Sequence, residues 1–251
     1  MITKNTIKQI ASLRQQKFRK ELGLFVVEGR KMTEELLRSD FEVDSLFATT
    51  AFLEDCMTPF PQAELVSETQ MAQMSGQDTP PGLLAVVRIP EERPLSATAR
   101  LIPALDGIAN PGNLGTLIRT AEWFGLRDIV CSPDCVELWN PKVIQATMGS
   151  VFRVRVTKAE LPVFLTHQRE SGKAVFGALL EGDNIFGMEE PAEGVLVIGS
   201  ESHGIRKDVM PCITHPVTIP RAEGSVTESL NAAVAAGILM AQLTRPASHR
   251  L

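Results

Sequence analysis

The sequence predicts an α/β protein with a mostly parallel β-sheet. Short apolar runs alternate with segments that repeat apolar residues at helical spacing, which is the order of elements in parallel α/β proteins. Several of the later runs, such as VLVIG at 195–199, are apolar without interruption, as in strands that helices cover on both faces. PEERPLSAT at 90–98 breaks this alternation with two prolines and polar residues, which predicts a linker between two domains.

An N-terminal domain is predicted over residues 1–92, followed by the linker at 93–99. Apolar positions between residues 5 and 22 recur at helical spacing and stop at Gly23, which predicts one helix. A strand over 24–29 and an amphipathic helix over 30–40 come next. Further strands, separated by short helical pieces, are expected at 43–49, 63–66 and 82–89.

A second domain is predicted over residues 100–251. Its strands are expected at 101–108, 127–132, 152–156, 173–180, 195–199 and 216–220. Its helices are expected at 113–124, 139–149, 161–171 and 228–245. The carboxyl ends of parallel strands form one edge of the sheet, and α/β proteins bind their ligands there.

Composition and charge favour an ordinary globular protein. The chain is 44% hydrophobic and 22% charged, which argues against extensive disorder. It has no run of eighteen apolar residues and no apolar core of the signal-peptide type at its start, so we expect a cytoplasmic protein without a membrane span. The four cysteines form no CxxC pair, which predicts free thiols rather than a metal site.

Positive charge is concentrated near the N-terminus. The net charge is −5, yet residues 1–38 contain nine lysines and arginines against four glutamates. Such a basic face is compatible with local contact to RNA phosphates, since the attraction is short-ranged. A solvated helix face explains the same pattern.

Three polar loops follow predicted strands of the second domain. The G-x-G-x-x-G, Walker A and G-x-S-x-G sequences are absent, which argues against dinucleotide enzymes, P-loop NTPases and esterases. Instead, glycines combine with amide, hydroxyl and carboxylate groups after 101–108, 195–199 and 216–220. In the third loop, Ser225 and Glu228 have the spacing of a capping box, so Ser229, Leu230 and Asn231 are expected in the first helical turn.

Small residues dominate the last predicted helix. NAAVAAGILMAQ has little bulk, so another backbone can approach it closely. Tight packing within one chain and packing against a second copy both fit this composition.

Three motifs together resemble those of a known family. NPGNLGTLIRTAEWFG, VLVIGSESHGIRKDVM and TIPRAEGSVTESLNAAVAA resemble, in order and spacing, the signature motifs of SpoU/TrmH-type RNA ribose 2′-O-methyltransferases of the SPOUT superfamily. FVVEGRKMTEELLRS is similar to the small α/β substrate-binding domain of many members, a module like RNA-binding ribosomal proteins. The chain departs from the pattern at Arg221, where the family usually has Met, and its third loop is longer.

The resemblance implies a fold, a cofactor and a set of site residues. The C-terminal domain would form a deep trefoil knot that binds S-adenosylmethionine, and catalysis would occur at a homodimer interface. The expected cofactor positions are Gly199, Ile219, Leu230 and, in a preceding loop, Leu179. The expected catalytic residues are Arg119, Asn110, Glu201, Ser229 and Asn231.

The resemblance assigns Arg119 to the activation of the ribose 2′-hydroxyl. A guanidinium holds its proton too tightly to be an easy base, so a clamp on the neighbouring phosphate and the developing alkoxide is physically simpler. Taken singly, these residues have plain structural interpretations: Asn113 as a helix cap, Arg119 paired with Glu122, Glu201 as a surface charge. We interpret His203 as part of the loop without a catalytic role.

The predicted function is methylation of a ribose in ribosomal RNA, with transfer RNA as the second candidate substrate. A catalytically silent RNA-binding or ribosome-assembly protein would have the same fold, but the presence of Arg119, Glu201 and the Ser-Leu-Asn run argues against it. Methylation of a base is disfavoured because the three motifs are of the ribose type.

Overall fold

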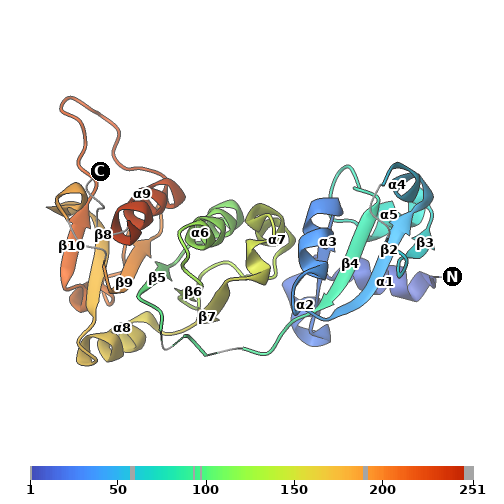
Figure 1. The fold of residues 1–251 in the computed structure, drawn as a ribbon, viewed down its shortest axis with the longest axis horizontal. Coiled ribbons are helices and arrows are strands. Elements are labelled where there is room, and N and C mark those ends of the chain that lie inside the picture. The colour runs from blue at the N-terminus through green and yellow to red at the C-terminus, as the bar shows by residue number, and fades with distance from the viewer. Residues whose placement is uncertain (1, 57–59, 93, 97, 189–191, 246–251) are drawn as a thin grey trace. The chain divides into compact units, whose positions relative to one another are not determined.

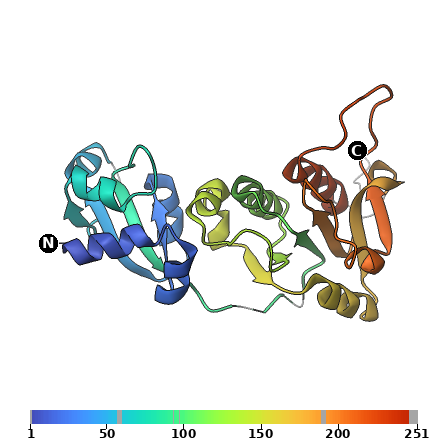
Figure 2. The ribbon, with the colours of Figure 1, turned by 180° about the vertical axis from the view of Figure 1, so that it is seen from behind.

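A computed structural model describes residues 2–56, 60–92, 94–96, 98–188 and 192–245. The chain divides into two compact units, which Figures 1 and 2 show from opposite sides. Unit 1 comprises residues 1–91 and 137–152, and unit 2 comprises residues 92–136 and 153–251. Strands and helices alternate along the chain, so the predicted α/β class is confirmed. The predicted domain boundaries at 92 and 100 stay a prediction.

Unit 1 is built on a four-stranded sheet within the described residues. Its strands lie in the order β1-β4-β2-β3, antiparallel except for the parallel pair β2 and β3. The elements up to residue 88 are α1 (Lys4–Ser12), α2 (Gln16–Leu22), β1 (Leu24–Glu28), α3 (Arg30–Leu37), β2 (Val43–Thr49), α4 (Thr50–Asp55), β3 (Glu64–Val66), α5 (Glu68–Met74) and β4 (Leu83–Arg88). The segment 137–152 adds α7 (Pro141–Thr147) and the 3₁₀ turn η1 (Ser150–Phe152).

Both faces of this sheet are buried. In β1, Phe25 and Val27 pack into one apolar cluster with Ile144, while Leu24 and Val26 pack into another with Ile10. Successive side chains of a strand point to opposite faces, so the apolar run of β1 supplies two cores at once. The segment 137–152 therefore completes one of these cores.

The predicted helix over 5–22 is two helices. α1 ends at its C-cap Leu13, and α2 begins after Gln15, whose backbone is extended. Leu13 and Arg19 are almost fully buried. Helical spacing of apolar residues continues through the break, so the periodicity did not reveal it.

Two arginines of the predicted basic face, Arg14 and Arg19, form hydrogen bonds with other residues of unit 1. Arg19 is 1% exposed and donates hydrogen bonds from Nε to both carboxylate oxygens of Glu137, at 3.2 and 3.0 Å, and from Nη1 to the Leu13 carbonyl at 2.7 Å. Arg14 donates to the carbonyls of Gln73 and Ser75. The exposed positive charge of α1 and α2 therefore comes mainly from lysines: Lys4, Lys8, Lys17 and Lys20.

Unit 2 is built on a six-stranded parallel sheet within the described residues, in the order β10-β8-β9-β5-β6-β7. Its strands are β5 (Leu101–Asp106), β6 (Asp128–Cys131), β7 (Arg155–Lys158), β8 (Ala174–Asn184), β9 (Gly194–Gly199) and β10 (His215–Thr218). Its helices and turns are α6 (Pro111–Trp123), α8 (Leu161–Glu170), η2 (Ile185–Gly187), η3 (Met210–Cys212) and α9 (Ala232–Thr244).

The topology places β5 and β9 side by side at the centre of this sheet. From β5 the chain proceeds outward through β6 and β7, then crosses to β8 and returns to β9. This reversal makes the carboxyl ends of β5 and β9 the point where α/β sheets bind ligands. α6 packs against α9 there, and Figure 1 shows the two helices side by side.

The buried pair Arg19–Glu137 allows a test of unit 1. Glu137→Gln removes the negative charge that compensates the buried guanidinium, so we expect the free energy of unfolding to fall by about 3 kcal/mol. Urea unfolding in a Trp123→Phe background measures this, because Trp139, which packs on Phe25, is then the only tryptophan.

Glu42→Gln is the matched control, since Glu42 is 71% exposed where it pairs with Arg88. An exposed pair contributes little, so the unfolding midpoint should hardly move. Equal effects of the two substitutions would contradict a structural role for the buried pair.

Candidate active site

Three polar segments meet the carboxyl edge of the parallel sheet. Residues 107–110 follow β5, residues 200–205 follow β9, and residues 219–231 follow β10. Because β5 and β9 are hydrogen-bonded along their whole length, ending at the pair Asp106 and Gly199, the first two segments leave the sheet side by side. The predicted convergence of the first and second motifs follows from this pairing.

Asn110 caps α6. Its Oδ1 accepts hydrogen bonds from the backbone N–H groups of Gly112 (2.8 Å) and Asn113 (3.2 Å), and Pro111 occupies the first helical position. The helix therefore begins at Pro111, two residues before the predicted start at 113. Since Asn110 supplies the cap, the side chain of Asn113 is free for another contact.

Asn113 joins the three segments. Its Nδ2 donates a hydrogen bond to Oε1 of Glu201, and its Oδ1 accepts one from Nδ2 of Asn231 at 3.2 Å. Asn231 in turn caps α9 through Oδ1, which accepts from the N–H groups of Ala233 (3.0 Å) and Val234 (3.3 Å). Each of these two asparagines thus accepts through its amide oxygen and donates through its amide nitrogen, so all of these hydrogen bonds can form at the same time.

Sequence reasoning did not place Asn113 among the catalytic residues. It treated this side chain as a loop amide or helix cap, and the cap is Asn110 instead. The sequence NPGN contains an indication of this second contact. One asparagine before a proline at the first helical position is enough to cap the helix, so the other asparagine is available to bind elsewhere.

A tight turn carries Glu201. Ser200 and Gly204 exchange two backbone hydrogen bonds, at 3.2 and 2.9 Å, so the chain folds back on itself directly after β9. A Cβ added at Gly199 would lie 2.1 Å from the carbonyl carbon of Gly204. Only glycine fits there, because the returning backbone occupies the space of a side chain.

Arg119 is exposed and unpaired on α6. It makes no hydrogen bond or ion pair with any residue that the structure describes. The suggested partner Glu122 binds Arg127 at 3.2 Å and also Arg153. By helix geometry Arg119 lies about 9 Å along the axis and about 120° around it from Asn113. The cation therefore lies on another side of α6 and is not part of the amide network.

The predicted cofactor positions line the same edge. Gly199 ends β9, Ile219 follows β10 and is half-buried, and Leu230 precedes the α9 cap and is 46% exposed. Leu179 lies within β8, which corrects its predicted place in a loop. Pairing between β8 and β9 ends at Gly177, and β8 pairs again with β10 at Asp183, so Leu179 lies between these two paired stretches.

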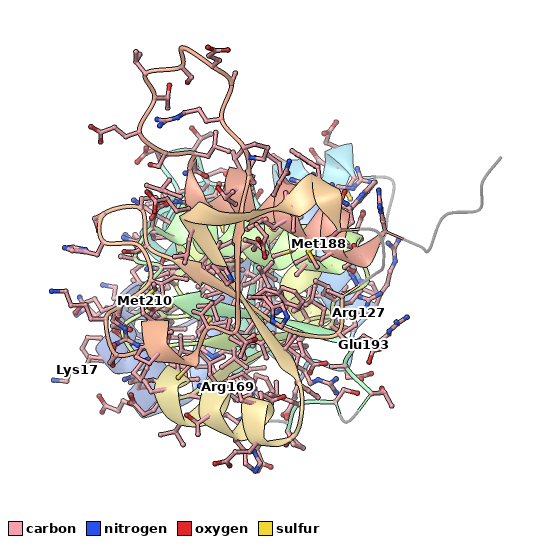
Figure 3. The ribbon with its side chains drawn as sticks, turned by 90° about the vertical axis from the view of Figure 1, so that its left-hand side faces the viewer. Lys17, Arg127, Arg169, Met188, Glu193 and Met210 are labelled. Atoms are coloured by element: carbon pink, nitrogen blue, oxygen red, sulfur yellow. The ribbon has the colours of Figure 1, made fainter. Side chains whose placement is uncertain are left out.

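The segment 220–231 is exposed at every residue, and Figures 1 and 3 show it standing away from the sheet. Nη1 of Arg221 donates to the carbonyl of Thr227 at 2.7 Å and closes the outer loop. The predicted capping box of Ser225 and Glu228 is wrong, because α9 begins only at Ala232. Ser229 consequently lies before the helix, without a hydrogen bond to the described residues.

A thiol anchors the loop that leads to Asn110. Ile108 donates its backbone N–H to Sγ of Cys135 at 3.2 Å. Hydrogen bonds from Cys131, and further ones from Ser132 and Ile108, outweigh burial and lower the pKa of Cys135 to about 6. The same contact with Cys135, together with burial, raises the pKa of Cys131 well above its ordinary value. The sulfur that accepts from Ile108 is thus the one of the two whose pKa is lowered.

None of the four cysteines is part of a disulfide. Within the described residues, no group of three or more His, Cys, Asp or Glu side chains could hold a metal ion. Among the same residues, no helix has the length and apolar character needed to span a membrane.

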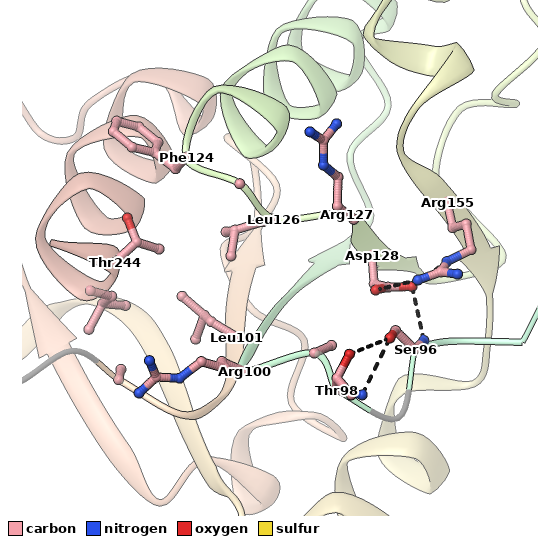
Figure 4. A pocket seen from close by; sticks show the side chains of 14 residues that line it. Ser96, Thr98, Arg100, Leu101, Phe124, Leu126, Arg127, Asp128, Arg155 and Thr244 are labelled. Carbon is pink, nitrogen blue, oxygen red and sulfur yellow. Dashed lines mark hydrogen bonds and ion pairs between the residues drawn. The ribbon is translucent and has the colours of Figure 1, made fainter. Parts of the chain in front are cut away.

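A pocket of about 440 Å³ lies at the opposite end of the sheet (Figure 4). Leu101 and Asp128, the first residues of β5 and β6, line it together with Arg127 and Arg155. It belongs to the amino ends of the strands and contains none of the predicted site residues.

Comparison with known proteins agrees with this geometry. The model of the SpoU rRNA Methylase family matches residues 100–241, and that of the MRM3-like substrate binding domain matches residues 4–85. The Bacillus subtilis protein named 23S rRNA (guanosine(2553)-2′-O)-methyltransferase RlmP is 30% identical over 94% of this chain and 95% of its own length.

Solved structures match both units. A TrmH-family protein from Porphyromonas gingivalis is 37% identical, with a TM-score of 0.85 over 97% of this chain and 98% of its own. An rRNA methyltransferase from Sinorhizobium meliloti, solved with bound AdoMet, is 26% identical, with a TM-score of 0.83 over 100% of this chain and 97% of its own. The resemblance drawn from the three motifs is confirmed: the chain belongs to the SpoU rRNA methylase family and is an RNA methyltransferase.

Proposed function

We propose that the protein transfers the methyl group of S-adenosylmethionine to a ribose 2′-hydroxyl of ribosomal RNA. The observation that carries this proposal is the network of Glu201, Asn113 and Asn231, together with the exposed Arg119 on the same helix as Asn113. It joins all three motifs at the carboxyl edge of the sheet, where a ligand is expected. The named activity of the Bacillus subtilis relative, a 2′-O-methyltransferase of 23S rRNA, supports ribosomal over transfer RNA.

The residues at this edge fit S-adenosylmethionine. Gly199 is partly exposed at the end of β9, while Ile219, Leu230 and Leu179 offer apolar contacts that are only partly buried within the chain. The segment after Pro220 is exposed, so its backbone and side-chain polar groups can contact adenine and the amino-acid end of the cofactor. When bound, the cofactor supplies an electrophilic methyl group on a sulfonium.

Arg119 provides the charge that the reaction needs. Because it is exposed and unpaired, its guanidinium can bind the phosphate next to the target ribose with two parallel hydrogen bonds. The same cation stabilises the oxygen as it loses its proton, which leaves through phosphate or water. Orientation of the hydroxyl by the clamp contributes further, since positioning alone is worth effective molarities of about 10⁵–10⁸ M.

The polar network fixes the ends of the segments that form the proposed site. Asn110 and Asn231 fix where α6 and α9 begin, and Glu201 holds the amide of Asn113 between them. Ser229, exposed and one turn before α9, is left to bind the ribose or the cofactor. Unit 1 contributes RNA affinity through the exposed lysines of α1 and α2.

A homodimer is part of the proposal. The exposed face of α6 carries Arg119 and Trp123, and Trp123 is 84% exposed. On α9, Ala232, Ala233 and Ala236 are buried within the chain, whereas Val234 is 52% exposed. The small residues therefore serve packing inside one chain, while the larger apolar side chains beside the site remain for a second copy. A deep trefoil knot and a cytoplasmic location complete the proposal and stay predictions.

Methylation of purified RNA tests the function. The protein is incubated with labelled S-adenosylmethionine and either ribosomal or transfer RNA, and digests are searched for nuclease-resistant 2′-O-methyl dinucleotides. Label in ribosomal RNA supports the proposal. Label in transfer RNA alone favours a transfer RNA enzyme, label in a base favours a base methyltransferase, and no label despite cofactor binding favours a silent RNA-binding protein.

Arg119→Ala should slow methyl transfer in single-turnover experiments by about 10²–10³-fold, as expected for loss of one preorganised charge. Arg119→Lys should recover part of the rate, because an ammonium keeps the charge but lacks the planar fork. Arg127→Ala is the control, since Arg127 is another exposed arginine of unit 2 but lines the pocket at the opposite end of the sheet.

The pH–rate profile separates the clamp from a base. With a clamp, wild type and Arg119→Lys should have profiles of the same shape and different height. An inflection that shifts with the substitution would show that this side chain itself carries the proton.

Trp123→Glu should convert the dimer to monomer at micromolar concentration and abolish methyl transfer, because it places a charge in the apolar contact. Sedimentation velocity measures the first effect and the RNA assay the second. Val163→Glu on α8, also at an exposed apolar position (72%), should change neither. A dimer that survives Trp123→Glu would move the interface away from this face.

A further inference from the structure

A buried carboxylate lies beneath the proposed site. Asp106 is the last residue of β5 and is fully buried. It accepts two hydrogen bonds from Arg206, one from the backbone N–H at 2.7 Å and one from Nε at 2.6 Å. Arg206 follows the turn that carries Glu201, so the pair joins the end of β5 to the exit of this turn.

The turn at 200–204 is closed at its neck by backbone bonds and held at its tip by one side-chain contact. Ser200 and Gly204 close it, and Glu201 at the tip contacts Asn113. A closed turn can still pivot as a body about the strand that precedes it. Two bonds from Arg206 to one buried carboxylate remove that freedom, because they hold both the backbone and the side chain directly after the turn.

The guanidinium of Arg206 also lies close to two further carboxylates. Its Nη1 lies 3.7 Å from Oδ1 of Asp134 in the loop after β6, and its Nε lies 3.9 Å from Asp208. Nη2 is buried and has no hydrogen-bond partner among the described residues. The side chain is thus held in one place by its bonds to Asp106, although one of its donors is left unsatisfied.

We propose that Asp106 and Arg206 are positioning residues for methyl transfer, which hold the turn so that Glu201 stays against Asn113. Neither residue touches RNA or the methyl donor in this role, and both act through Glu201. The inference rests on the proposed function of this site. It predicts that loss of Asp106 matters only while Glu201 is present.

Asp106→Asn tests directly whether Asp106 holds the turn at 200–204, with Asp128→Asn as a matched control. Asp128 is 2% exposed and accepts from Nε and Nη2 of Arg155 at 2.7 and 2.9 Å, but it lies at the amino end of the sheet (Figure 4). Hydrogen exchange of the amides at 200–206 should accelerate about tenfold or more in Asp106→Asn and stay unchanged in Asp128→Asn. Unchanged exchange in both variants overturns the proposal.

A double-mutant cycle with Glu201→Gln tests the catalytic consequence. We expect Asp106→Asn alone to slow single-turnover methyl transfer roughly tenfold and to add less than about twofold in the Glu201→Gln background. Multiplicative losses would show a general structural effect and overturn the positioning role. Asp128→Asn should leave the rate unchanged in both backgrounds.

The proposal can still be tested if the Asp106→Asn variant does not fold or if the wild type methylates no RNA. If Asp106→Asn does not fold, Arg206→Lys replaces it, since lysine keeps the charge and the backbone bond but has no Nε–H at that place. If the wild type methylates no RNA although it binds the cofactor, the proposed function fails, and the exchange rates alone decide whether Asp106 holds the turn.

Discussion

A side-chain amide, that of Asn113, connects segments that lie almost ninety and one hundred and twenty residues further along the chain. An amide suits this position because one end donates and the other accepts, so a carboxylate and a second amide can bind it at the same time. An aspartate would repel Glu201, and an apolar residue would leave both partners unsatisfied. The arrangement of the site depends on this one side chain being in register with Glu201 and Asn231.

That register is set by where two helices begin. Asn110 and Asn231 each accept two backbone N–H bonds, so α6 starts at Pro111 and α9 at Ala232. Asn231 performs a second task, since its Nδ2 reaches Asn113 while its oxygen remains in the cap. A shift of either helix by one residue would rotate the amides by about 100° and separate them. The two helix caps therefore also fix the geometry of the site.

The sequence allowed the α/β class, the parallel sheet and most strands to be predicted, because uninterrupted apolar runs are specific for strands covered on both faces. The start of α9 was misplaced because Ser225 and Glu228 have capping spacing, whereas the true cap is chosen by contact with α6 and Asn113, which lie far away in sequence. The extension of β8 to Asn184 was missed for the same reason: polar residues such as Glu181 and Asp183 continue the strand only because β10 pairs with it. That Glu201 could hold a loop amide or the arginine was predictable, but its choice of Asn113 was not, since this contact depends on β5 and β9 being neighbours.

In the proposed homodimer, the exposed segment 220–231 would link cofactor binding to dimerisation. It carries Leu230 and Ser229, yet every one of its residues is exposed in the isolated chain, so its conformation is set by few internal contacts. A second copy that packs on Trp123 and Val234 would also order this neighbouring segment, and the bound methyl donor would order it too. When two ligands order the same segment, each lowers the entropic cost of binding the other. By thermodynamic linkage the coupling is mutual: a donor that binds more tightly to the dimer must itself strengthen the dimer by the same factor.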